Sequence, residues 1–135
     1  MHLKREEGAA AVEFALVLPI LIVILFGTIE FGLILYNQEV ITNASREGAR
    51  YGIVIGSPRP TTTQIQDVVN TYLTNSGLNA GNATTTVTGA QGASGSNLAV
   101  TVTYPYNLLV LQNFVSVWAG QSTLDLQSKT VMKLE

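Results

Sequence analysis

The chain contains no cysteine in its 135 residues, which excludes disulfides, thiolate nucleophiles and cysteine-based metal sites. The one histidine, His2, lies at the N-terminus, so the body of the chain cannot build a histidine-dependent triad or metal cluster. Charged residues make up only 12% of the chain and the net charge is −2, which argues against nucleic-acid binding. An enzyme would need a pair of acids such as Asp67 and Asp125, which no motif brings together. We therefore expect neither catalysis nor a cofactor.

What the chain does have is a long apolar run near its N-terminus, over residues 9–36. Its ionisable side chains are Glu13, Glu30 and the terminal Tyr36. The run exceeds the roughly 20 residues that a membrane-spanning helix needs, and we predict such a helix here. Its uncharged part, residues 14–29, is about 24 Å long, which places the two acids near opposite membrane interfaces. Glu30 is then expected to need no partner until subunits pack together.

A short charged segment, residues 1–8, precedes the apolar run and ends in Gly8. The run is longer than the apolar part of a secretory signal, and no Ala-x-Ala cleavage site follows it. Lys4 and Arg5 favour a cytoplasmic N-terminus, although two adjacent glutamates weaken this signal. The rest of the chain is then expected outside the membrane.

The helix is expected to continue beyond the membrane as an amphipathic segment, giving one helix over residues 9–56. Pro19 removes one helical hydrogen bond and is expected to kink it. Arg46 and Arg50 have two interpretations: a solvated face, or contacts with Glu30 or Glu39 of a neighbouring subunit. Glycine and two prolines then end the helix.

The remaining residues, 57–135, are expected to form an α+β head. Thr61-Thr62-Thr63 offers an N-cap for a second short helix that ends near Gly77. Alternating patterns predict a three-stranded antiparallel sheet covered by the long helix. The strands are expected at residues 83–88, 98–104 and 123–134, with inward side chains in the last two from Leu98, Val100, Val102, Tyr104, Leu124, Leu126, Met132 and Leu134. The apolar segment 108–118 needs cover from the head, the membrane surface or a partner.

Several segments carry a resemblance to a known family. Residues 10–19 read AAVEFALVLP, residues 26–32 read FGTIEFG, and residues 42–51 read TNASREGARY. Together they resemble the TadE family, minor pilins of the tight adherence (Tad) pilus system. Residues 100–106 and 128–135 are similar to that family as well.

The resemblance implies specific roles at the N-terminus. A prepilin peptidase would cut after Gly8, so that Ala9 becomes the new N-terminus and Glu13 its fifth residue, followed by Phe14. In a filament, Glu13 would neutralise the free amine of a neighbouring subunit, because an isolated carboxylate is costly among apolar helices. The alternative is that Glu13 simply sits at the cytoplasmic interface.

The function implied is a non-enzymatic minor pilin that assembles or initiates a Tad-type type IV pilus used in adherence. Its partners would be prepilin peptidase, the lipid bilayer before assembly, and, through the N-terminal helix, other pilin subunits and the assembly platform. It would reside in the inner membrane with its head outside, and in the extracellular pilus if incorporated. One alternative is an uncleaved single-pass assembly factor of the same machinery. Another is a tethered binding module that uses the Gly/Ser-rich loop at residues 89–97.

Overall fold

The computed structural model describes residues 3–135, except for the side chains of residues 3–7, Phe114 and Trp118. Met1 and His2 of the expected leader therefore lie outside the described residues. So does the Trp118 side chain, at the end of the apolar segment 108–118.

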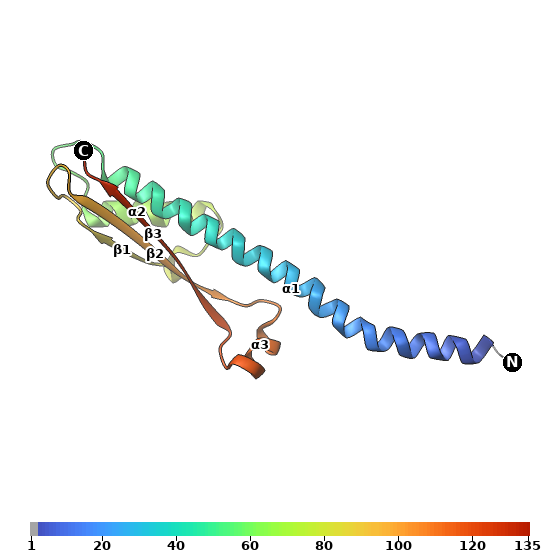
Figure 1. Ribbon diagram of the computed structural model, residues 1–135. Coiled ribbons are helices and arrows are strands. Elements are labelled where there is room, and N and C mark those ends of the chain that lie inside the picture. The colour runs from blue at the N-terminus through green and yellow to red at the C-terminus, as the bar shows by residue number, and fades with distance from the viewer. Residues whose placement is uncertain (1–2) are drawn as a thin grey trace.

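The longest element is helix α1, Leu3–Gly52, which is continuous over 50 residues and contains Pro19. Figure 1 shows its axis bending in the N-terminal part. Its C-terminal half lies along the head, and its N-terminal half projects away from the head (Figure 1). The helix ends at Gly52, four residues before the predicted end at residue 56.

Helix α2, Thr62–Asn75, begins at the N-cap that the sequence predicted. The backbone amide of Gln64 donates to Oγ1 of Thr61, and the amide of Thr61 donates back to Oε1 of Gln64. This reciprocal capping box satisfies two amides that the first helical turn leaves without partners. The buried face of α2 consists of Ile65, Val69 and Leu73. A single turn of 3₁₀ helix, η1, Ala80–Asn82, leads from α2 into the sheet.

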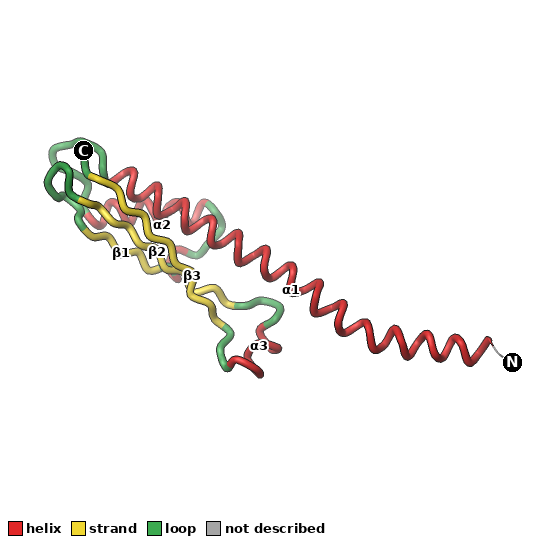
Figure 2. Tube along the Cα trace, in the orientation of Figure 1, coloured by secondary structure: helices red, strands yellow, loops and turns green. Residues whose placement is uncertain are grey.

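The sheet has three antiparallel strands in the order β1-β2-β3 (Figure 2). They are β1, Thr84–Thr88, β2, Asn97–Asn107, and β3, Thr123–Lys133. The long helix, the short second helix and this sheet confirm the predicted α+β class. One face of the sheet meets both helices in a single core, to which β2 contributes Leu98, Val100 and Val102, all with no exposed surface.

Small residues bring α1 close to α2 and the sheet. A methyl group built on Gly48 would lie 2.5 Å from Cγ2 of Val69, and one on Gly52 would lie 2.5 Å from Cδ2 of Leu98. Both distances are shorter than a non-bonded contact allows, so these two glycines set the depth at which the helix packs. The segment read as TNASREGARY is thus a packing surface.

Two features differ from the sequence prediction at the end of the sheet nearest the uncovered half of α1. Strand β2 continues three residues past Tyr104, and a short helix, α3, Gln112–Ala119, joins it to β3. Leu124 was predicted to point into the core, but it is 45% exposed. The reason is that β1 begins at Thr84, opposite Thr103, so β2 and β3 extend beyond the three-stranded sheet at this point.

Candidate functional site

The N-terminal half of α1 is uncovered. Every side chain over residues 8–29 is exposed or half-exposed, although almost all of them are apolar. This stretch is long and apolar enough to cross a membrane, which is compatible with a single-pass membrane protein. An apolar surface of this size on a water-soluble domain would be unfavourable, so lipid or other helices must cover it.

The residues expected to act in processing and assembly all lie on this uncovered half. Gly8, Ala9, Glu13 and Phe14 follow one another along the first turns, and each is exposed. Phe14 keeps 60% of its surface accessible. Their positions leave them free to meet a peptidase or another helix.

The fully uncovered stretch ends at Glu30, which is only 2% exposed and is the first buried residue after Gly8. The hydroxyl of Tyr106 donates to its Oε1 atom at 2.5 Å, and the amide of Leu109 donates to the same oxygen at 3.0 Å. The amides of Val110 and Leu111 donate to Oε2 at 2.7 and 3.3 Å. One carboxylate therefore receives four hydrogen bonds from its own chain.

The donors around Glu30 come from the loop that follows β2. Three successive amides facing one carboxylate form a small anion-binding concavity, and hydrogen bonds to an ionised acceptor are among the stronger ones. Tyr106 is itself 5% exposed. Burial, and then the bond to Glu30, raise the pKa of Tyr106, so its hydroxyl remains a donor at neutral pH.

The structure corrects the expectation that Glu30 lacks a partner until subunits pack. A buried carboxylate is tolerated only when donors surround it, and here they belong to its own chain. Arg46 is exposed, and Arg50 pairs with Glu47, one turn away on the same helix, at 2.7 Å. The hydrogen bond from Arg50 lowers the pKa of Glu47. Such an exposed pair adds little to stability.

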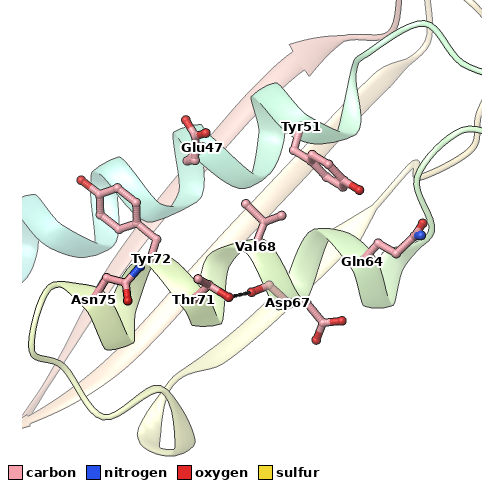
Figure 3. Close-up of a pocket in the computed structure, with 8 residues that line it drawn as sticks. All are labelled: Glu47, Tyr51, Gln64, Asp67, Val68, Thr71, Tyr72 and Asn75. Atoms are coloured by element: carbon pink, nitrogen blue, oxygen red, sulfur yellow. Dashed lines mark hydrogen bonds between the residues drawn. The ribbon is translucent and has the colours of Figure 1, made fainter.

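A shallow groove of about 470 Å³ lies between α1 and α2. Figure 3 shows the ring of Tyr51 on α1 pointing towards α2, while the carboxylate of Asp67 points away from α1. The hydroxyl of Thr71 donates to the backbone carbonyl of Asp67 at 2.8 Å. Asp125 lies on β3, at the opposite edge of the sheet from β1, the strand that α2 contacts. The two aspartates considered for catalysis are therefore not brought together.

Metal ligands do not converge in the part of the chain that the structure describes: no group of three or more histidine, cysteine or acidic side chains there could hold an ion. The features that stand out chemically are the uncovered apolar helix and the hydrogen-bonded Glu30.

Sequence reasoning missed three participants in this region: Tyr106, the amides of residues 109–111, and α3. A signal was present in Pro105, which lacks an amide and so favours an edge position in a sheet. A second signal was the free-energy cost of burying an acidic side chain within an apolar helix, because such a side chain requires hydrogen-bond donors.

Residues 8–50 match the family model described as TadE-like protein. This segment of the chain is TadE-like. The match confirms the resemblance to the TadE family over this segment. No curated protein and no solved structure matches the chain at a significant level.

The TadE-like segment lies within α1 and includes parts of both halves of the helix. In its C-terminal part, Ser45, Gly48 and Ala49 are buried against the head. In its N-terminal part, Glu13 and Phe14 face outward. Packing within the chain accounts for the first group and leaves the second group without a role inside the isolated subunit.

Proposed function

We propose that this protein is a pilin-like subunit, a minor pilin of a Tad-type pilus, which waits in the inner membrane and then enters or initiates a filament. The observation that carries the proposal is the division of α1 into a covered half and an uncovered apolar half (Figure 1). A helix that only served the head would end where the head ends. This one continues with more than twenty apolar-rich residues that no part of the head covers.

Before assembly, the uncovered half would cross the bilayer. From Gly8 to Glu30 the helix rises about 33 Å, close to the roughly 30 Å of a hydrocarbon core. Glu30 and its donors would then mark the outer boundary, so the membrane-spanning part ends before Tyr36. The positive charges of Lys4 and Arg5 support an N-terminus on the cytoplasmic side.

During assembly, the same surface would become the core of the filament. Cleavage after Gly8 by a prepilin peptidase would give Ala9 a free ammonium group. Glu13 is exposed, and it would neutralise that group on a neighbouring subunit as both leave contact with water. A helix–helix bundle supplies the apolar cover that lipid supplied earlier. No catalytic role is required of this chain at any step.

The intact mass of the protein in purified filaments tests this proposal. We expect a chain that starts at Ala9, with residues 1–8 missing. The matched control is Gly8→Ala, which should remain full length in membranes. Absence of the protein from filaments, together with a full-length mass in membranes, would overturn the proposal in favour of an uncleaved assembly factor.

A further inference from the structure

Strands β2 and β3 extend beyond the sheet and carry a separate small lobe. Residues 104–107 of β2 pair with residues 123–126 of β3 and have no β1 residue opposite them. They form a two-stranded stem, and residues 108–120 at its tip form what we call the lobe, which includes α3. Figure 1 shows α3 at the end of the head from which the uncovered half of α1 emerges.

The lobe presents an uncharged and partly apolar surface. The chain has no Asp, Glu, Lys or Arg between Asn107 and Leu124. Within this region Val117 is 81% exposed and Leu109 is 68% exposed, and Leu124 on the stem adds a third exposed apolar side chain. Two-stranded ribbons are only marginally stable alone in water, so a stem with such a tip favours a second contact.

Glu30 fixes the height of the lobe along α1. The amides of Leu109, Val110 and Leu111 all donate to its carboxylate, so the start of the lobe lies within one side-chain length of this turn of α1. At the same turn the head begins to cover one side of α1, while Phe31 and Leu35 remain exposed. The apolar surface of the lobe therefore lies at the same position along the axis of α1 as the end of the fully uncovered apolar stretch.

We propose that the lobe docks onto the outer surface of the lipid bilayer, with Val117 and Leu109 inserted at the boundary between headgroups and acyl chains. This inference rests on the proposal that α1 crosses the membrane. Lipid is the occupant favoured by the position of the lobe and by its lack of charge. Short amphipathic helices occupy this boundary in the same way, with their apolar side chains buried by several ångströms.

The docked lobe gives the head a second anchor beside the helix. A single helix leaves a head free to tilt and rotate, whereas two contacts with the same surface restrict both motions. Because Glu30 joins the lobe to α1, the head keeps one orientation relative to the bilayer until the subunit is extracted. The Glu30 carboxylate thus positions the lobe relative to α1.

The absence of cysteine allows a direct test with the full-length chain. Val117→Cys, Thr86→Cys and Leu21→Cys are each labelled with the fluorophore NBD and reconstituted in phosphatidylethanolamine–phosphatidylglycerol vesicles. Thr86 is exposed on β1 and serves as the head control, and Leu21 is exposed in the apolar half of α1. A lipid nitroxide placed near the headgroup end of the acyl chain quenches labels at the boundary.

We expect the lipid nitroxide to quench the label at 117 and to leave the label at 86 unchanged, and we expect the emission at 117 to shift to shorter wavelength on reconstitution. If the label at 117 is as accessible to aqueous iodide as the label at 86, while the label at 21 is buried in lipid, the docking proposal is wrong. The proposal that α1 crosses the membrane is then retained. If 21 is also accessible to iodide, both proposals fail. If the label at 117 is accessible to iodide in vesicles but protected in assembled pili, the lobe contacts a neighbouring subunit and the lipid proposal is wrong.

Discussion

The hydroxyl of Tyr106 on β2 donates to the carboxylate of Glu30 on α1 at 2.5 Å, although the two residues are 76 positions apart in the chain. Both side chains are buried. The same carboxylate accepts the amides of residues 109–111, so it joins α1, the stem and the lobe. The point where the head meets the uncovered helix is therefore held by one acidic side chain.

Glu30→Gln should loosen this junction. The amide of glutamine keeps the shape, but it loses the negative charge and presents donors to backbone amides that need an acceptor. Leaving buried donors unsatisfied costs on the order of 1–3 kcal/mol, and more at a charged site, so we expect a loss of about 3 kcal/mol in unfolding free energy. Denaturation of the full-length protein in detergent, followed by circular dichroism, measures it. Protease cleavage within residues 108–120 should accelerate.

Glu39→Gln is the matched control, because Glu39 is exposed on the same helix and accepts one bond, from Asn43 at 2.9 Å. Its effect should stay within about 0.5 kcal/mol. Tyr106→Phe removes one of the four donors to Glu30 and should have an intermediate effect. Equal stability of Glu30→Gln and Glu39→Gln would show that the observed contacts do not hold the lobe.

Close packing of α1 on α2 gives a second prediction, at Gly48. Alanine is the better helix former by about 1 kcal/mol. At this position, however, its methyl group would lie 2.5 Å from Val69, and overpacking a core typically costs about 1–3 kcal/mol. We expect Gly48→Ala to destabilise the head, and Val69→Ala to recover part of the loss in the double variant.

Gly32→Ala provides the comparison within the same helix, because a methyl group there meets no atom within 4 Å. In detergent this variant should be neutral or slightly stabilising. The two alanine variants should therefore change the melting temperature in opposite directions or by clearly different amounts. Similar shifts for both would contradict the close contact of α1 with α2.

The hydroxyl groups between α1 and β3 give a third prediction. Ser45 is fully buried, and its hydroxyl oxygen lies 2.7 Å from Oγ1 of Thr130 and 3.2 Å from Oγ of Ser128. Ser45→Ala leaves a hydroxyl without one of its partners and should cost about 1 kcal/mol or more. Removing both partners of the shorter bond in Ser45→Ala/Thr130→Val should cost less than the sum of the single changes. Additive losses in a double-mutant cycle would argue against this bond.

The sequence predicted the features that depend on neighbouring residues. The N-cap within residues 61–63 is a local signal, and the alternation of Leu98, Val100 and Val102 and the apolar run of α1 are local patterns with a fixed period. The donors of Glu30 were out of reach for the same reason. They lie nearly 80 residues further along the chain, and three of them are backbone amides, which carry no side-chain signature.

Helix α3 was missed because little marks it locally. It has eight residues, its N-cap Leu111 makes no side-chain hydrogen bond, and the segment is rich in the β-branched and aromatic residues that favour strands. The stem and the contact of the loop with Glu30 determine where it forms. The sequence predicted that segment 108–118 needs apolar cover. In the structure Leu109 and Val117 of this segment remain exposed.

Glu13 gives the prediction that separates a pilin from a simple membrane anchor. It is exposed near the start of the uncovered half of α1, and the side chains around it are apolar. At a membrane interface it would remain solvated and dispensable. Inside a filament it would be buried, and only a positive group such as the ammonium of Ala9 could offset the cost of desolvation.

Glu13→Ala should therefore be inserted and cleaved like the wild type but should be depleted from purified pili, as measured by immunoblots of membrane and pilus fractions. Glu39→Ala, which changes an exposed acid in the half of α1 beside the head, should be incorporated normally. Normal incorporation of Glu13→Ala would reduce Glu13 to an interfacial residue and remove the proposed pairing between neighbouring subunits.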